Sequence, residues 1–584
     1  MNEIEKPDGP SGNAEPGWGS DTMALAVRNL GLKYVALNPG ASFRGFHDSL
    51  VNFLGNRDPQ MILCLHEDHA VSIAHGYAKV AGEPMGVVLH SNVGLMHGSM
   101  GIFNAFCDRV PVIVFGATGP VDAAKRRPWI DWIHTAQDQG GLIRNFIKWD
   151  DQPASVEAAI ESIYRANQIA RTAPRGPVYV CLDADLQERK LDTPILPPDA
   201  RRYAAAKPQR PSDEAIAEAV ALLDNARRPA ILSGRFARTQ AAWDARIRLA
   251  EKLGAVVFTD FKAGATFPTE HPLHGGTMQF LGESQKQALQ SCDVILSLDW
   301  IDLAGTLGQA WPDGNVSARI IHASIDQYVH NGWSMDHQGL PPVDVTLLSE
   351  ADAAVPLLTE ALRSTRPAAV PAARTDLEDP DPDSKLTLDH IAAALKEAVG
   401  DSPVSLVRLP GGWPGERWPF NGPLDFLGYD GGGGIGSGPG MAIGAALALK
   451  DSDRLAIAVI GDGDFLMSVN AFWTAAHYRI PLLTIVANNQ SYFNDEMHQD
   501  RVARIRSRNP ENRWIGQKIR DPDLDLAKLA EAQGLTGIGP VKTIGQLATG
   551  VMKGVAVLRE GGTCVIDVRV GPRGATAATM IGRR

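Results

Sequence analysis

Short apolar runs rich in β-branched residues alternate along the chain with longer stretches of helical periodicity. These runs lie at 34–40, 84–91, 110–118, 176–183, 228–235, 255–261, 293–299, 318–324, 403–409, 455–463, 481–489 and 562–570. Strands that are apolar on both faces and alternate with helices are typical of parallel sheets covered by helices on both sides. The pattern therefore predicts an α/β fold of three consecutive open, doubly wound parallel-sheet domains.

Two proline-rich segments, 190–211 and 364–384, interrupt this alternation. Both lack apolar periodicity, which is typical of linkers that cross a protein surface. The predicted divisions are a flexible polar tail at 1–20, domains at 21–189, 212–363 and 385–575, and a C-terminal tail at 576–584. Each of the three domains then has an ordinary domain size.

The composition narrows the classes of partner. The 584 residues are 44% hydrophobic and 21% charged, with a net charge of −11, as in soluble globular proteins. A mildly acidic chain argues against a nucleic acid or an anionic membrane as partner, and no apolar run could span a bilayer. The five cysteines are widely spaced, so neither structural zinc nor disulfides are expected. Because the N-terminus lacks a signal-peptide pattern, we expect a cytoplasmic protein.

Polar residues follow two apolar strands of the third domain directly. The first strand leads into Gly461-Asp462-Gly463-Asp464, and the second into Asn488-Asn489, with 24 residues between Gly463 and Asn488. In a parallel sheet both motifs would face one crevice at the carboxyl ends of the strands. Carboxylate and amide oxygens suit Mg²⁺, and the glycines would let backbone N–H groups approach a diphosphate. Either motif alone is more typical of a turn, but together they predict a metal–diphosphate site.

This pair of motifs resembles the signature of thiamine-diphosphate (ThDP) enzymes of the acetolactate synthase and pyruvate decarboxylase type. The resemblance extends over essentially the whole chain after the N-terminal tail. It implies a pyrimidine-binding first domain, a middle domain and a diphosphate-binding third domain. The implied Mg²⁺ ligands are Asp462, Asn489 and the carbonyl of Ser491, and the implied diphosphate-binding residues are Gly461, Gly463 and Asp464.

A second glycine cluster, 431–440, precedes the metal motif. Three of its glycines match the dinucleotide fingerprint GxGxxG, but no strand runs into it and such dense glycines match easily by chance. In the resembling enzymes this loop opens a helix and carries one large apolar residue that bends the cofactor. By that resemblance Ile435 is the large residue, and Gly433 and Ile435 would contact the aminopyrimidine through their backbone.

An acidic residue, Glu67, follows an apolar strand and opens a helical pattern in the first domain. A glutamate in the first turn of a helix has a sufficient structural reason to be there. The stretch 66–78, HExxxxxxAxGYA, nevertheless resembles the catalytic-glutamate motif of ThDP enzymes. In that role Glu67 would protonate N1′ of the cofactor, which then forms its C2 ylid.

The pair His90-Ser91 follows the next strand and resembles the benzoylformate decarboxylase branch. His90 is the predicted acid–base group on the substrate side, because histidine titrates near neutrality. The turn Asn38-Pro39-Gly40-Ala41-Ser42 also matches this branch, with Pro39 on the cofactor side. Ala41 replaces the branch's substrate-binding serine, which weighs against an aryl-2-oxo-acid substrate. The expected substrate contacts are Ala41, Ser42 and Ser91.

Polar residues continue beyond the metal motif. Asp495 lies six residues after Asn489, where pyruvate-decarboxylase relatives carry an acid, and His498 lies on the same predicted helical turn with Glu496. These groups could tune one another's protonation or could form a solvated face. Asp495 and His498 are retained as candidate catalytic residues.

The predicted enzyme is a ThDP- and Mg²⁺-dependent carbon–carbon lyase. It would decarboxylate a 2-oxo acid or cleave an acyloin after the cofactor ylid adds to the carbonyl, with carboligation as a further outcome. An acetolactate synthase-like acyl transferase and a hydrolase of a cyclic 1,2-diketone are the alternatives. The His90-Ser91 pair weighs against the transferase, and the middle domain carries no convincing FAD-binding signal. The resemblance also implies a homo-oligomer, a dimer or homotetramer, with sites between subunits.

Overall fold

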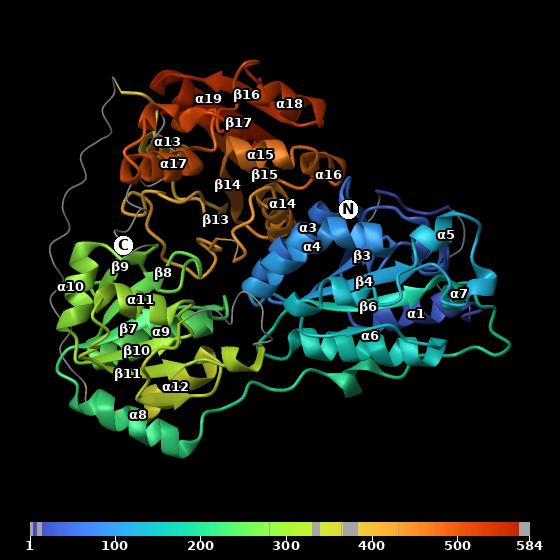
Figure 1. Ribbon diagram of the computed structural model, residues 1–584, viewed down its shortest axis with the longest axis horizontal. Coiled ribbons are helices and arrows are strands. Elements are labelled where there is room, and N and C mark those ends of the chain that lie inside the picture. Colours follow the sequence, from blue (N-terminus) through green and yellow to red (C-terminus); the bar gives the residue numbers. More distant parts are fainter. Residues whose placement is uncertain are drawn as a thin grey trace.

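Three parallel sheets, each flanked by helices, form the molecule (Figure 1). The computed structural model describes residues 4–8, 15–279, 281–329, 339–363, 365, 384–429 and 431–571. The predicted fold class is therefore confirmed. Nearly all of the predicted linker 364–384, and the predicted tail 576–584, lie outside the described residues.

The first domain contains a six-stranded sheet in the order β2-β1-β3-β4-β6-β5. Its strands are β1 (Tyr34–Leu37), β2 (Gln60–Leu63), β3 (Met85–Leu89), β4 (Val112–Thr118), β5 (Asp150–Asp151) and β6 (Val178–Asp183). Its helices are α1 (Gly19–Asn29), α2 (Arg44–Asp48), α3 (Glu67–Ala81), α4 (Ser91–Cys107), α5 (Ile130–Ile133), α6 (Val156–Arg171) and α7 (Ala184–Gln187). Leu37 pairs in parallel register with Leu63 and Val88, so the segments after β1, β2 and β3 leave from one edge.

The middle domain contains a six-stranded sheet in the order β12-β11-β10-β7-β8-β9. Its strands are β7 (Pro229–Ser233), β8 (Val256–Asp260), β9 (His274–Met278), β10 (Val294–Leu298), β11 (Arg319–Ala323) and β12 (Val345–Leu347). Its helices are α8 (Asp213–Asn225), α9 (Gln240–Leu253), α10 (Glu283–Ser291), α11 (Leu303–Ala310) and α12 (Ala351–Ala361). The central strands β7 and β10 are buried along their whole length, as expected for a sheet covered on both faces.

The third domain contains a five-stranded sheet in the order β13-β14-β15-β17-β16. Its strands are β13 (Val404–Arg408), β14 (Leu455–Gly461), β15 (Leu482–Asn488), β16 (Thr536–Val541) and β17 (Thr563–Arg569). Its helices are α13 (Leu388–Val399), α14 (Gly438–Leu449), α15 (Asp462–Met467), α16 (Ala471–His477), α17 (Phe493–Ile505), α18 (Leu526–Ala532) and α19 (Ile544–Arg559). Gly461 pairs with Ala487, so the segments after β14 and β15 also leave from one edge.

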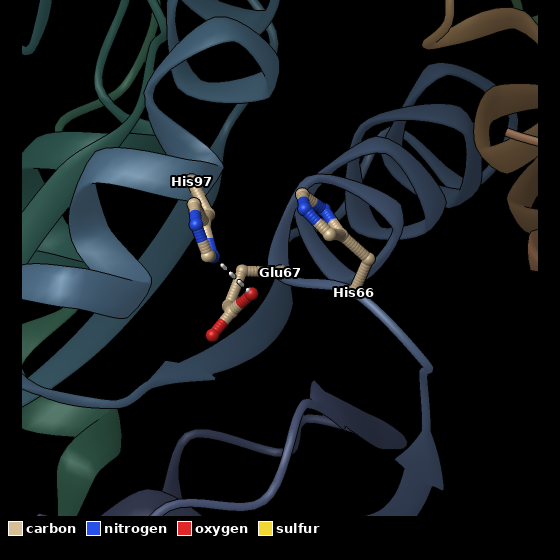
Figure 2. Close-up of side chains that lie close together, drawn as sticks. All are labelled: His66, Glu67 and His97. Atoms are coloured by element: carbon tan, nitrogen blue, oxygen red, sulfur yellow. Dashed lines mark hydrogen bonds and ion pairs between the residues drawn. The ribbon is translucent and has the colours of Figure 1, made fainter. Parts of the chain in front are cut away.

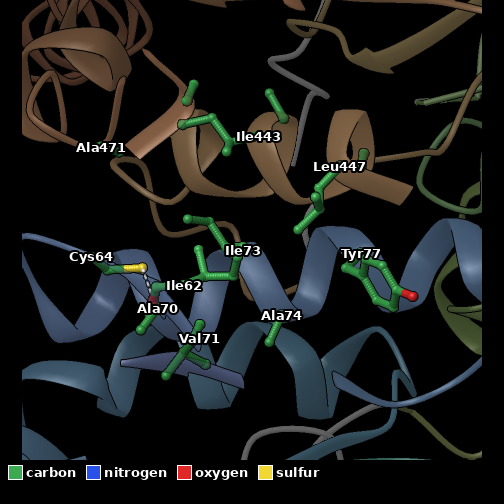
Figure 3. Packing of buried hydrophobic residues seen from close by; sticks show 14 of the residues in the cluster. Ile62, Cys64, Ala70, Val71, Ile73, Ala74, Tyr77, Ile443, Leu447 and Ala471 are labelled. Atoms are coloured by element: carbon green, nitrogen blue, oxygen red, sulfur yellow. Dashed lines mark hydrogen bonds between the residues drawn. The ribbon is translucent and has the colours of Figure 1, made fainter. Parts of the chain in front are cut away.

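The first and third domains share one hydrophobic core, in which α3 lies along α14 (Figure 3). A Cβ atom built on Gly444 would lie 1.9 Å from the carbonyl oxygen of Ile73, and one built on Gly76 would lie 2.0 Å from that of Met441. The two helices therefore touch backbone to backbone, at a distance that any side chain at these glycines would prevent. Ile73, Ile443 and Leu447 fill the space beside this contact.

Parts of the predicted N-terminal tail contact the body of the protein. Helix α1 begins at Gly19, inside the segment predicted as tail, and Trp18 forms an isolated bridge with Lys190. The hydroxyl of Tyr478 donates to the Glu5 carboxylate at 2.7 Å. All five cysteines are buried and unpaired. Over the residues that the structure describes, every helix is too short or too polar to cross a membrane.

Candidate active site

The metal motif lies at the edge where β14 and β15 end. Asp462 is the first residue of α15 and is 3% exposed. The N–H of Ser491 donates to its Oδ2 at 3.1 Å, which brings these two predicted ligands together. Asn488 is engaged elsewhere, because its amide donates to Asp567 at 2.8 Å. Asn489, the predicted ligand, has a buried Oδ1 without a hydrogen-bond partner.

These donors fit a hard divalent cation. Burial raises the pKa of the Asp462 carboxyl to about 6, which means that the surrounding protein groups stabilise the charged carboxylate only weakly. Buried polar oxygens are normally hydrogen-bonded, and the exception at Asn489 therefore calls for a partner from outside the chain. The Ser491 hydroxyl is bonded to the buried Glu496, which leaves the Ser491 carbonyl as the donor on this side. An all-oxygen set of this kind is the type that binds Mg²⁺.

A cavity of about 800 Å³ lies at this edge, between the third and middle domains. Its lining includes these predicted site residues: Gly433, Ile435, Gly461, Asp462, Gly463, Asp464, Asn489, Ser491 and Asp495. Asp260, Lys262 and Trp300 are among the residues of the middle-domain wall. The cavity thus gathers the predicted metal and diphosphate residues, together with the glycine cluster that precedes them in the chain.

The glycine loop is fixed to the metal motif by Asp464. Oδ1 of Asp464 accepts the N–H groups of Gly436 at 2.6 Å and of Gly438 at 3.3 Å, and Arg408 lies 3.6 Å from Oδ2. The Asp464 side chain is therefore turned toward the loop, and its backbone is the part left for a diphosphate. Within the loop, Ile435 is the large apolar residue and is 40% exposed where it lines the cavity.

One predicted catalytic residue of the first domain, Glu67, lies beside two histidines. Glu67 is buried at the start of α3, and His97 of α4 places its Nδ1 3.0 Å from Oε2 of Glu67 (Figure 2). The rings of His66 and His97 are stacked, with their centroids 4.9 Å apart. His97 was not predicted from the sequence. It is separated from Glu67 by 30 residues, and only the packing of α4 on α3 makes them neighbours.

His90 is held by Ser42. The Ser42 hydroxyl lies 2.8 Å from Nδ1 of His90 and also accepts the N–H of Ser91 at 3.1 Å. Burial lowers the pKa of His90 below its usual value, and the neighbouring His134 lowers it further. The His134 ring meets His90 edge-on at 4.7 Å and is a second residue that the sequence did not reveal.

Three other predicted residues are either exposed or hydrogen-bonded to a neighbour in the chain. Ala41 and Pro39 are exposed on the turn after β1. Ser91 is buried, and its hydroxyl is turned to Asn92 at 3.2 Å.

The two candidates on α17 differ in position. Asp495 is exposed and lines the cavity, whereas His498 is exposed but is not among the residues that line it. Glu496, between them, is buried and pairs with Lys518 at 2.6 Å as well as with Ser491. Glu496 thus supports the metal motif.

The two groups of residues lie on different domains and do not share the cavity. Among the described residues, those that line it all belong to the middle and third domains.

Family models match most of the chain. The N-terminal TPP-binding domain of thiamine pyrophosphate enzymes matches residues 17–142, the central domain matches 216–338, and the C-terminal TPP-binding domain matches 411–568. Together the three matches follow the order of the three sheets.

Curated relatives match along most of their length. A benzoylformate decarboxylase of Pseudomonas aeruginosa is 25% identical over 491 residues, which is 80% of this chain and 85% of the relative. A probable acetolactate synthase large subunit of Methanocaldococcus jannaschii is 26% identical over 542 residues, which is 88% of this chain and 86% of the relative.

Solved structures share the fold. The benzoylformate decarboxylase of Polynucleobacter necessarius superposes with a TM-score of 0.79 at 21% identity, covering 96% of this chain and all of the other. The 4-hydroxybenzoylformate decarboxylase of Rhodococcus jostii gives a TM-score of 0.76 at 22% identity, covering 95% and 99%.

Proposed function

The chain belongs to the thiamine pyrophosphate enzymes, and from this membership we propose that it is a ThDP- and Mg²⁺-dependent decarboxylase or lyase of a 2-oxo acid or acyloin. The observation that carries the proposal is the cavity at which Asp462, the orphaned amide oxygen of Asn489, and Ile435 meet. A benzoylformate decarboxylase and a probable 2-ketoarginine decarboxylase among the relatives support a 2-oxo acid as substrate.

The third domain would hold the cofactor. Asp462, Asn489 and the Ser491 carbonyl would bind Mg²⁺, and the backbone of Gly461, Gly463 and Asp464 would bind the diphosphate. Ile435 and Gly433 would shape the pyrimidine side. When bound, thiamine diphosphate supplies the nucleophilic carbon that adds to a substrate carbonyl.

The first domain would supply the acid–base groups. Glu67 would hold a proton on its carboxyl for N1′ of the cofactor, in a position screened from water. His90, neutral near pH 7 because burial lowers its pKa, would move a proton at the substrate side, with Ser42 fixing its ring. Asp495, in the cavity wall, is placed to serve as a second such group.

The separation of Glu67 from the cavity supports a homo-oligomer with sites between subunits. In such an assembly the first domain of one chain would close the cavity of its neighbour. A dimer is the smallest assembly that meets this requirement, and a closed two-fold pair provides two equivalent sites.

Transfer of an acyl group to a second carbonyl is the main alternative, because acetolactate synthases are among the relatives. A hydrolase of cyclic diketones is less well supported, since only Asp495 of its two candidate residues lines the cavity. Incubating the protein with ThDP, Mg²⁺ and a panel of 2-oxo acids, acyloins and cyclic diketones, while following CO₂ and products together, tests all three. Release of CO₂ from none of the acids would reject the decarboxylase.

A further inference from the structure

A cluster of two histidines and one glutamate lies between α3 and α4 (Figure 2). His66 is the N-cap of α3, Glu67 is its first residue, and His97 extends from the second turn of α4. One ligand atom of each side chain lies within 4.8 Å of those of the other two. The three groups thus converge from two helices on one small volume.

The geometry resembles a metal site that needs only a small adjustment. Two ligands of one tetrahedral Zn²⁺ ion, with bonds of about 2.0–2.1 Å, lie about 3.3 Å apart. His97 Nδ1 and Glu67 Oε2 are already 3.0 Å apart. Nδ1 of His66 accepts the N–H of Asp68 at 3.1 Å, which fixes this ring and leaves its Nε2 as the donor for an ion.

The ligand types select the class of ion. Imidazole nitrogens suit Zn²⁺, Ni²⁺ and Cu²⁺, whereas Mg²⁺ is bound through oxygen. Glu67 is buried and offers a carboxyl oxygen as a ligand, and the His97 side chain is 59% exposed in the single chain.

We propose that His66, Glu67 and His97 bind a divalent transition-metal ion of the Zn²⁺ class, at a second metal site distinct from the oxygen-rich set of the third domain. An ion there occupies the carboxylate that the proposed function assigns to the proton at N1′. The expected consequence, which rests on the proposed function, is that Zn²⁺ inhibits the enzyme and that a chelator reverses the inhibition.

Binding is tested first, without any assay of turnover. The full-length protein is titrated with Zn²⁺ against a chromogenic chelator, and the zinc ligands are read by X-ray absorption. Asp462→Asn removes the carboxylate among the proposed Mg²⁺ ligands, so zinc that this variant binds with unchanged affinity does not depend on that ligand set. His66→Asn keeps an acceptor for the Asp68 N–H, and His97→Gln keeps a donor for Glu67, so both variants retain the local hydrogen bonds. His498→Gln, which alters an exposed histidine of α17, is the matched control.

We expect one tightly bound Zn²⁺ per chain, with imidazole ligands, in the wild type, Asp462→Asn and His498→Gln. Each of His66→Asn and His97→Gln should weaken this binding about a hundredfold or more, because losing a group that merely supports a ligand already costs about 10- to 100-fold. Zinc affinity unchanged in both variants, with circular dichroism showing folded protein, would overturn the site.

The activity arm separates the two proposals. Zinc binding at the cluster without decarboxylation of any tested acid would leave the metal site standing and reject the proposed function. Decarboxylation that Zn²⁺ does not inhibit, in a protein that binds no Zn²⁺ at the cluster, would reject the metal site and leave the proposed function standing.

Discussion

Ser42 and His90 are joined by a hydrogen bond of 2.8 Å between Oγ and Nδ1, which fixes the imidazole at the N-terminus of α4. The same hydroxyl accepts the N–H of Ser91, so one side chain orders both the ring and the start of the helix. The orientation of His90 therefore depends on a residue of the turn after β1, far from it in the chain.

Replacing this hydroxyl should impair turnover more than folding. We expect Ser42→Ala to lower kcat/KM about tenfold. The His90 imidazole would lose its fixed orientation but could still bind and release a proton. Since burial lowers the pKa of His90, the activity that needs its neutral ring should persist until the pH falls below about 6.5. The measurement is kcat/KM against pH, with Ser99→Ala on the same helix as control. Equal losses in the two variants would contradict the role of Ser42.

The backbone contact between α3 and α14 should tolerate no side chain. Gly444→Ala places a Cβ atom against the Ile73 carbonyl, so we expect a loss of about 2 kcal/mol or more in unfolding free energy. Gly308→Ala is the control: this exposed glycine of α11 has open space around it, and alanine there should be neutral or stabilising by up to about 1 kcal/mol. Thermal unfolding of both variants measures the difference. A Gly444→Ala variant as stable as Gly308→Ala would show that the helices can separate freely.

A half-buried histidine of the middle domain should make stability depend on pH. Burial lowers the pKa of His322 to about 4, so the unfolded chain binds this proton more readily than the folded one. The unfolding free energy should therefore fall as the pH drops from about 6.5 toward 4, by about 2 kcal/mol from this group. Unfolding of the wild type and His322→Gln at both ends of the range isolates the contribution. As the pH falls, the His322→Gln variant should lose less stability than the wild type. An equal loss in the two proteins would argue against a contribution from His322.

Sites between subunits predict complementation. Glu67→Gln and Asp462→Asn should each be inactive, because in a dimer of either variant every site lacks one of these two residues. After subunit exchange in an equimolar mixture, half of the dimers would be mixed and each would carry one intact site, giving about a quarter of wild-type activity. Activity of the mixture no higher than that of the separate variants would place the whole site within one chain.

The sequence predicts best where residues are close along the chain. The residues 461–464 and Asn489 share a cavity because each motif directly follows a strand of one parallel sheet. The three-domain α/β fold could be predicted for the same reason, since buried parallel strands are apolar throughout.

The sequence is weaker where packing decides. His97 reaches Glu67 only through the rotation of α4 against α3, and His134 meets His90 only through the path of a long segment after β4. Asp464 was predicted as a diphosphate residue, but its carboxylate turns to the glycine loop, which no local pattern reveals. Asp495 and His498 share a helix, yet only Asp495 reaches the cavity wall.

The close approach of α3 and α14 also limits how the chain can be recombined with its relatives. Gly76 and Gly444 each fit against the backbone of the opposite helix, so the two surfaces must have matching shapes. A chimaera that takes its first domain from one parent and its third from another would join two faces that were shaped separately. Libraries of such hybrids should place their crossovers so that both helices come from the same parent.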